Sequence, residues 1–363
     1  MMFGMRSFEV RKDDIRETRL VEAPEVPLAS GQARLKVDFF SLTSNNVTYA
    51  AIGSGPLAYW DFFPAEDPAW GRTPVWGFAE VVASQAEGVE VGRRVYGYFP
   101  MSESLDVIPV KVSAGSFIDG AEHRRGKAVI YNQYFFTDAD PAYDADFEAE
   151  QTLFRPLYAT GWLAADCVAR SEPPPQNVII SSASSKTAFA TAHQAKSRGG
   201  ITVVGLTSER NLAFVEGTRL YDRVVTYEAA EQLALSGPTV FVDYLGRRPV
   251  TAAVHAAVGE HLTRSLVIGV ADWEAQTQPR ERVPGPKPEM FFAPGYIAER
   301  VKADGPAVLA ELNSANRAFY PLSREFVVAR RESGTAAVER TWGTLVDGKA
   351  SPADGYVVSF TEA

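Results

Sequence analysis

The strongest constraint on the fold is an alternation of short apolar strands and helical patterns across residues 155–318. Strand-like runs rich in β-branched residues are followed by stretches with the 3.6-residue period of a helix. Connections of this length require the strands to be parallel, with helices covering the sheet. The alternation therefore predicts a doubly wound α/β domain, preceded by a helix over residues 153–169. The strands are expected near residues 177–180, 201–208, 223–227, 238–246 and 265–271, and the other helices near 189–198, 211–220 and 250–261.

The first 115 residues have a different pattern. Segments 33–42, 78–84 and 92–99 alternate apolar and polar residues or form β-branched runs, and Gly and Pro interrupt them. Such a pattern favours a barrel-like β domain. Residues 116–150 combine charged and aromatic residues without a regular period, so we expect an inserted loop region there. The Pro-rich segment 278–295 ends in apolar residues, so we expect it to pack against a partner or the substrate cleft rather than to act as a linker.

Composition narrows the function class. The 363 residues carry 36 basic and 45 acidic side chains, a formal charge of −9, and contain no concentrated basic block. This argues against a nucleic-acid or anionic-membrane surface. A single cysteine, Cys167, excludes an internal disulfide framework. Without a signal-peptide pattern or an apolar run of ~20 residues, we expect a cytoplasmic protein that does not cross a membrane.

The strongest site signal is the serine-rich turn SSASSKTA, residues 181–188, between the first strand and helix of the α/β domain. In doubly wound domains this turn and the helix N-terminus hold a pyrophosphate through backbone N–H groups. Small residues permit close approach, and the predicted phosphate donors are Ser182, Ser184, Ser185, Lys186 and Thr187. The alternative is an ordinary serine-capped helix.

The next strand ends in VVGLTSERN, residues 203–211. A dinucleotide site that selects NAD usually places Asp or Glu at the ribose 2′-hydroxyl, whereas Arg with small hydroxylated residues accommodates the 2′-phosphate of NADP. Thr207, Ser208 and Arg210 therefore favour NADP. Glu209 could instead select NAD, and a solvated charged loop is the third possibility.

The order of these features resembles the medium-chain dehydrogenases/reductases, in particular their zinc-free, quinone-oxidoreductase-like branch. The combination of WGFAEVVAS, YNQY, DPAY, RPLYATGW, SSASSKTA and PEMFFAP resembles more closely an uncharacterised bacterial family in that superfamily. The resemblance implies a GroES-like β-barrel domain over residues 1–154 and 319–363 and a Rossmann-like domain over 155–318, with NADP as cofactor. The matching segments for the superfamily are residues 28–46, 76–84, 91–99, 155–164, 178–196, 240–246 and 355–360.

The chain departs from the zinc-dependent members at both metal positions. It has SLTSNN where they carry a Cys and WGFAE where they carry Gly-His-Glu, and the four-Cys lobe is absent. A catalytic zinc site usually needs three protein ligands. We therefore expect no metal. The serines also replace the glycines of the superfamily's phosphate turn, and Lys186 stands where an apolar residue is usual.

Two segments supply candidate catalytic groups. The resemblance places Asn45, Asn46 and Tyr49 in the loop that faces the nicotinamide. Tyr131 and Asn132 belong to the polar-aromatic segment YNQY in the insertion, where a tyrosine can donate a proton and an amide can orient a substrate. Alternatively, these groups satisfy buried backbone or a domain contact.

We expect a zinc-independent, NADPH-dependent reductase of a small carbonyl or activated-alkene substrate, acting as a monomer or homodimer. Tyr131, Asn132, Asn46, Tyr49 and Lys186 are the predicted catalytic residues. Two alternatives remain, because fold does not fix chemistry. One is a non-redox lyase or C–C bond hydrolase on the same fold, and the other is a nucleotide-binding protein without turnover.

Overall fold

The structure is a computed structural model that describes residues 5–55, 57–268 and 283–362. The chain forms two units, one of residues Met1–Leu153 with Val328–Ala363 and one of Phe154–Val327. Residues 269–271 of the last predicted strand and 278–282 of the Pro-rich segment lie outside the described residues. No described helix has both the length and the apolar character required to span a membrane.

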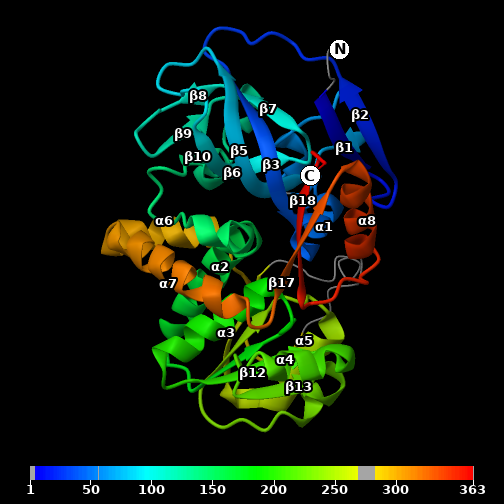
Figure 1. The fold of residues 1–363 in the computed structure, drawn as a ribbon. Coiled ribbons are helices and arrows are strands. Elements are labelled where there is room, and N and C mark those ends of the chain that lie inside the picture. The colour runs from blue at the N-terminus through cyan, green and yellow to red at the C-terminus, as the bar shows by residue number, and fades with distance from the viewer. Residues whose placement is uncertain (1–4, 56, 269–282, 363) are drawn as a thin grey trace. The chain divides into compact units, whose positions relative to one another are not determined.

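The first unit is built on a mixed sheet of nine strands in its described residues. The predicted strands near 33–42, 78–84 and 92–99 are present as its centre, β3, β5 and β6, which pair in antiparallel register. The sheet joins distant parts of the sequence, since β18 lies beside β3 (Figure 1). The strand order is β17(Val328–Ser333), β18(Asp354–Ser359), β3(Ala33–Leu42), β5(Pro74–Ser84), β6(Arg94–Pro100), β10(Gln133–Phe136), β9(Ser116–Asp119) and β8(Pro109–Val110), with β7(Ser104–Val107) also paired to β3.

The segment 116–150, which the sequence predicts as an inserted loop region, contains two strands of this sheet. β10 pairs with β6 on one side and β9 on the other. Its Tyr134 lies against Gly97 of β6, where a Cβ atom would come 2.4 Å from the tyrosine ring. The expectation of a loop is wrong here because the two strands, SFID and QYFF, are short runs of mixed polar and aromatic residues without a β-branched run that would mark them in the sequence.

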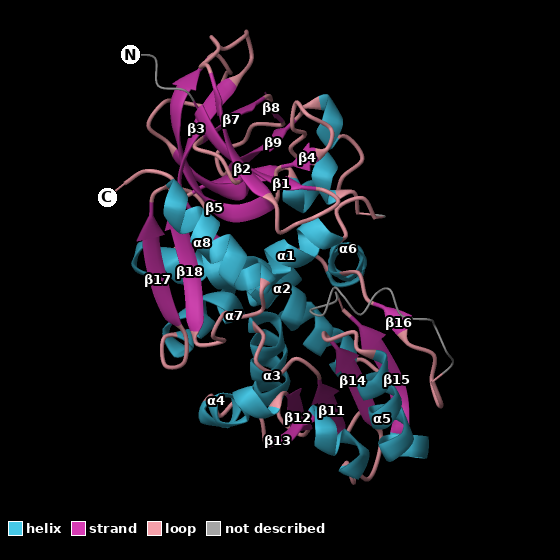
Figure 2. Cartoon of the chain, turned by 90° about the vertical axis from the view of Figure 1, so that its right-hand side faces the viewer, coloured by secondary structure: helices cyan, strands magenta, loops and turns pink. Residues whose placement is uncertain are grey.

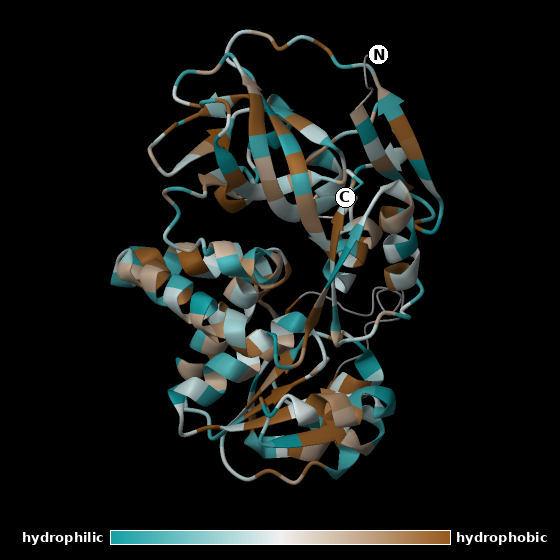
Figure 3. Cartoon of the chain, in the orientation of Figure 1, coloured by the Kyte–Doolittle hydropathy of each residue, from teal (hydrophilic) through white to brown (hydrophobic). Residues whose placement is uncertain are grey.

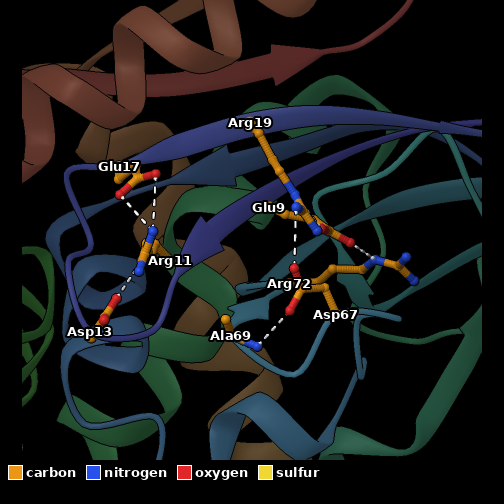
Figure 4. Close-up of polar contacts among 8 residues, drawn as sticks. All are labelled: Glu9, Arg11, Asp13, Glu17, Arg19, Asp67, Ala69 and Arg72. Atoms are coloured by element: carbon orange, nitrogen blue, oxygen red, sulfur yellow. Dashed lines mark hydrogen bonds and ion pairs between the residues drawn. The ribbon is translucent and has the colours of Figure 1, made fainter.

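A three-stranded sheet, in the order β2(Thr18–Ala23), β1(Met5–Arg11) and β4(Trp70–Gly71), completes the β structure of this unit. Glu9 of β1 is 1% exposed. Its carboxylate pairs with Arg19 at 2.7 Å and with Arg72 at 3.2 Å, and Figure 4 shows it between these two residues. The two arginines supply the counter-charge that a buried carboxylate requires. The helices of the unit are α1(Ser44–Ala51) and α8(Thr335–Val346).

The second unit contains the predicted parallel sheet. Its described strands run parallel, and Figure 2 shows β12, β11, β14 and β15 side by side. Part of the Pro-rich segment forms the edge strand β16, so residues 289–290 belong to the sheet rather than to a separate contact surface. The strand order is β13(Arg223–Thr226), β12(Thr202–Thr207), β11(Asn177–Ile180), β14(Thr239–Asp243), β15(Leu262–Val267) and β16(Glu289–Met290).

The core of this unit lies between the sheet and its helices. Ile179, Val204 and Phe241 of three neighbouring strands pack with Val254 and Val258 of α5 in one buried cluster. The strands accordingly are among the most apolar segments of the unit (Figure 3). The fold class expected from the sequence, a β-barrel-like unit joined to a doubly wound parallel sheet, is confirmed. The helices are α2(Glu148–Ala169), α3(Lys186–Arg198), α4(Leu212–Gly217), α5(Arg248–Val258), α6(Ala293–Asp304) and α7(Ala307–Ser323).

Candidate functional sites

The sheet of the second unit has a switch point between β11 and β14. The chain leaves β11 toward β12 and β13 on one side, and the later strands β14, β15 and β16 lie on the other. In open α/β sheets, ligands bind outside the carboxyl ends of the strands at such a point. The serine-rich turn follows β11 directly, so it lies at this position.

The serine-rich turn ends as the N-terminal cap of α3. The Ser185 side chain accepts a hydrogen bond from the backbone N–H of Ala188 at 3.3 Å, and Ser182 adopts a left-handed conformation with φ 51°. Lys186 and Thr187 are the first two residues of the helix, whose N-terminus favours negative charge. Both predicted features therefore coexist: the turn is serine-capped, and it presents small hydroxylated residues at a helix N-terminus.

Residues of the β12 end reach the turn. Asn211 donates through Nδ2 to Ser184 Oγ at 3.1 Å, which leaves the serine hydroxyl its own proton to donate. Thr207 is 0% exposed, and its hydroxyl has no hydrogen-bond partner in the described residues. Ser208 precedes a short 3-10 helix, Glu209–Asn211, on which Arg210 is exposed. The predicted 2′-phosphate residues thus lie on the segment that Asn211 ties to the turn.

A buried hydrogen-bond network holds the two central strands at the switch point. Ser181 donates to Asp243 Oδ1 at 2.6 Å and accepts from the backbone N–H groups of Tyr244 and Leu245 at 2.8 and 3.0 Å. Thr251 of α5 donates to the other carboxylate oxygen at 2.9 Å. This network fixes the loop after β14 relative to the turn. The sequence matches Asp243 to a structural position, but it does not reveal Ser181 as its partner.

Tyr227, at the end of β13, is a second residue at this edge that the sequence does not single out. Burial raises its pKa to about 12, while hydrogen bonding with Ser182 acts in the opposite direction. The phenol is therefore protonated at neutral pH and stands beside the left-handed residue of the turn.

The second candidate site is an aromatic cluster in the first unit that includes two predicted catalytic tyrosines. Tyr49 comes from α1, and Tyr131 comes from a short 3-10 helix, Val129–Tyr131. We call the group the tyrosine cluster. Its members are Tyr49, Tyr59, Tyr98, Tyr131 and Trp76.

The rings of the tyrosine cluster are in direct contact. Tyr49 stacks on Tyr59 with centroids 4.2 Å apart, and Trp76 lies 4.8 Å from the Tyr98 ring. Tyr131 lies 5.1 Å from Tyr98 and forms a hydrogen bond with Tyr59. Several phenol groups are thereby gathered inside an apolar surrounding.

Burial sets the protonation of these phenols. It raises the pKa of Tyr49, Tyr59, Tyr98 and Tyr131, because the charged phenolate is poorly solvated inside the cluster. All four remain protonated at neutral pH. The tyrosine cluster therefore supplies hydrogen-bond donors rather than bases.

The two predicted asparagines have their hydrogen-bonding groups engaged with backbone. Asn46 accepts from Thr43 N–H at 2.8 Å in the capping box of α1 and donates to the Pro74 carbonyl at 2.9 Å. Asn132 donates to the Arg124 carbonyl and accepts from Arg124 Nε, both at 2.9 Å. Through these hydrogen bonds, both amide side chains stabilise the local structure. The catalytic role of Asn46 and Asn132 stays a prediction, and this geometry does not favour it.

Arg124 is a buried residue that the sequence analysis does not identify. Its side chain is 0% exposed and binds the Tyr131 carbonyl, Asn132 and Asp119, the last at 3.6 Å. Its guanidinium also lies over the ring of Phe63, 4.7 Å from the centroid. Arg124 therefore fixes the segment that carries Tyr131.

The predicted site residues divide between the two units. Asn46, Tyr49, Tyr131 and Asn132 lie in the first unit, and the predicted cofactor residues, with Lys186, lie in the second. Within the part of the chain that the structure describes, no group of three or more His, Cys, Asp or Glu side chains could hold a metal ion. The absence of zinc stays a prediction.

Comparison with known proteins identifies the family and the fold. The family described as "Protein of unknown function (DUF2855)" matches residues 40–351. This confirms the resemblance to an uncharacterised family. No curated protein matches the chain.

Solved structures share the fold at low identity. CurA from Vibrio vulnificus is 15% identical, with a TM-score of 0.66 and 99% of both chains covered. Its complex with NADPH is 15% identical, with a TM-score of 0.63, and covers 99% of this chain and 100% of that one. The yhdH oxidoreductase from Salmonella enterica, in complex with NADP, is 14% identical, with a TM-score of 0.55 and coverage of 98% and 100%. The fold expected from the medium-chain dehydrogenases/reductases is therefore confirmed.

Proposed function

Because this chain belongs to the DUF2855 family and has the fold of oxidoreductases solved with NADPH or NADP, we propose that it is an NADPH-dependent reductase. Its substrate is a small carbonyl compound or activated alkene, and it works without zinc. It acts in the cytoplasm as a monomer or homodimer. The observation that carries the proposal is the serine-rich turn at the switch point of the parallel sheet.

The donors at this edge fit a phosphorylated dinucleotide. The Ser184 hydroxyl retains a proton to donate, and the unpartnered Thr207 hydroxyl is a further donor or acceptor at the end of β12. Thr187 and the N-terminus of α3 would hold the pyrophosphate, whereas Ser208 and Arg210 would hold the 2′-phosphate. When bound, NADPH supplies the hydride.

The tyrosine cluster supplies the proton in this proposal. Tyr131 and Tyr49 are protonated at neutral pH, so either can donate a hydrogen bond to the substrate oxygen as negative charge develops there. Hydride addition to carbon and proton donation to oxygen together reduce the carbonyl group. The Tyr59 hydroxyl, hydrogen-bonded to Tyr131, is a group that can return a proton to it.

One observation favours the alternative of a protein without redox turnover. Ser185 already satisfies the Ala188 N–H at the start of α3, and this is a group that a glycine-rich turn leaves for phosphate. Two alternative functions would tolerate the replacement of glycine by serine in this turn more readily. One is a nucleotide-binding protein without turnover, and the other is a lyase or C–C bond hydrolase that uses Lys186. Nucleotide affinity separates these possibilities.

The first experiment is a titration of the purified full chain with NADPH and NADH, for wild type and Arg210→Ala. We expect wild type to bind NADPH several-fold more tightly. A charge-assisted contact to the 2′-phosphate is worth about 1.5–3 kcal/mol, so Arg210→Ala should weaken NADPH about 10- to 100-fold and NADH little. Arg317→Ala, an exposed arginine on α7, is the matched control. Equal losses for both nucleotides would place Arg210 elsewhere, and failure of wild type to bind either would remove the reductase proposal.

The second experiment is turnover by Tyr131→Phe. General acid catalysis contributes about 10²- to 10⁴-fold, so we expect that loss in kcat with NADPH affinity unchanged. An unaltered kcat would exclude Tyr131 as the proton donor.

A further inference from the structure

Two buried donors of the tyrosine cluster have no partner in the described residues. They are the indole Nε1–H of Trp76 and the hydroxyl of Tyr98. Trp76 is 6% exposed and Tyr98 is 0% exposed, so bulk water does not satisfy them. We propose that Trp76 and Tyr98 are specificity-determining residues that bind an uncharged acceptor oxygen of the substrate. This inference rests on the proposed reductase function and names the recognition chemistry of its substrate.

Comparable buried aromatic donors of the same unit do have hydrogen-bond partners. Trp342, equally buried in the same unit, donates its Nε1–H to the Ile15 carbonyl at 2.9 Å. Tyr134, next to the cluster, donates to the Tyr98 carbonyl at 2.7 Å. A buried donor without a partner destabilises the folded protein. Two such donors side by side are therefore explained by a ligand that accepts from both.

The direction of the hydrogen bonds defines the ligand atom. An indole N–H can only donate, so the ligand must present an acceptor to Trp76. The Tyr98 ring lies 4.8 Å from the Trp76 ring and 6.2 Å from the Tyr49 ring, so the two donors lie beside the residue already proposed to donate to substrate oxygen. A carbonyl oxygen can accept two hydrogen bonds, one along each lone pair. The same two donors would hold it in a fixed orientation.

The surroundings select against a charged ligand. Arg124, a buried cation beside the cluster, is engaged with Asp119, Asn132 and the Tyr131 carbonyl. The remaining walls are aromatic, since the Trp76 ring stacks on Tyr96 with centroids 5.7 Å apart and planes at 15°. A carboxylate would lose its hydration without gaining a counter-charge. The cluster therefore fits a flat, uncharged compound with a carbonyl oxygen.

The segment that carries Tyr131 lies at the surface beside the tyrosine cluster. Tyr131 is partly exposed, and the preceding residues Val129 and Ile130 are 58% and 42% exposed. Exposed apolar side chains at the rim suit an apolar ligand that enters from this side.

The test uses the tryptophan indole signals of the 15N-labelled full chain, titrated without nucleotide. The probe is 1-indanone; indane, which lacks the oxygen, and indane-1-carboxylate, which is charged, are the controls. We expect 1-indanone to move the Trp76 Nε1–H signal, which is assigned by its loss in Trp76→Phe, and both controls to leave it in place. An unmoved signal, or an equal shift with indane, would overturn the inference.

Two substitutions give a second, independent measurement. We expect Trp76→Phe and Tyr98→Phe each to weaken 1-indanone binding about 10-fold, while the melting temperature of the free protein stays level or rises because no hydrogen bond is lost. Trp342→Phe should do the reverse, lowering the melting temperature and leaving binding intact. Tyr356→Phe, on β18, is a control for removal of a hydroxyl outside the cluster. If Trp76→Phe and Tyr98→Phe bind 1-indanone as wild type does, the inference fails.

Failure here and failure of the proposed function are distinguishable. Without nucleotide binding, the reductase proposal falls although 1-indanone still shifts the Trp76 signal. Without a response to 1-indanone, the recognition role of Trp76 and Tyr98 falls although NADPH still binds.

Discussion

Replacing Arg124 by Met removes the centre of the polar network beneath Tyr131. The wild-type guanidinium bonds to Asn132 Oδ1 at 2.9 Å and Tyr134 Oη at 3.4 Å, and it also binds the Tyr131 carbonyl. It also forms the ion pair with Asp119 at 3.6 Å, and both side chains are at most 2% exposed. Methionine fills a similar space without any donor, so the change tests the polar contacts more than the packing.

The expected loss follows from what the substitution leaves unpaired. Breaking a buried ion pair by removing one partner typically costs about 3–5 kcal/mol. Asp119 retains hydrogen bonds from the backbone N–H groups of Ile108 and Ala121, both at 3.1 Å, and these lessen the penalty of its unpaired charge. We therefore expect the lower end, about 3 kcal/mol, in the free energy of unfolding. Asp119→Asn in the same chain should recover part of this loss, since it removes the uncompensated charge.

Urea unfolding followed by tryptophan fluorescence measures this loss. Arg125→Met is the matched control, because the Arg125 side chain is 76% exposed and forms an ion pair with the exposed Glu122. An exposed pair of this kind contributes at most about 1 kcal/mol. If Arg124→Met costs no more than Arg125→Met, the polar network does not stabilise the unit as argued. If the two units unfold in separate transitions, only the transition of the first unit should shift.

Three further outcomes are expected. Gly161→Ala should cost about 1–3 kcal/mol in thermal unfolding, because a Cβ on α2 would lie 2.6 Å from that of Ala190 on α3; an unchanged melting temperature would contradict this close approach. Burial alone would raise the pKa of Asp166, but hydrogen bonds from Arg300 and Tyr296 hold it below its ordinary value. The stabilisation by Asp166 should thus be full above about pH 4 and disappear as the pH falls through the lowered pKa. The free energy of unfolding of Asp166→Asn should therefore depend less on pH in the acid range than that of wild type. An equally steep pH dependence in the variant would exclude Asp166 as the origin of the acid sensitivity. Chelation of metals should leave circular dichroism and activity unchanged, and stoichiometric zinc in elemental analysis of the untagged protein would refute it.

The sequence predicted the parallel sheet because its strands, such as β11 with NVII and β13 with RVVT, are β-branched runs that alternate with helical patterns. Residues 116–150 lack that alternation, since β9 with SFID and β10 with QYFF are short runs of mixed polar and aromatic residues separated by 3-10 turns. The pairing of β10 with β6 and β9 is a tertiary effect that no local pattern records. Periodicity likewise does not specify which strands are neighbours in a sheet.

Prediction of the site was limited in a similar way. Tyr49 and Tyr131 were identified as candidates, but Tyr98 and Trp76 come from β6 and β5 and reach the cluster only through sheet pairing. The structural role of Asn46 did have a local signal, since a threonine three residues before it completes a capping box. Arg124 had none, because a basic residue in a charged segment is expected to be exposed.

The discontinuous first unit has a consequence for biosynthesis. The second unit is one continuous stretch, residues 154–327, whereas the first unit needs residues 328–363 as well. On the ribosome, β3 therefore emerges long before its neighbour β18. The edge of β3 at residues 40–42, which is buried in the folded unit, has no β18 to pair with while some 300 further residues are made. An exposed apolar edge of this kind is prone to pair with another chain. Newly synthesised chains thus depend on the second unit being completed, and on β18 being made, before the first unit is protected from aggregation.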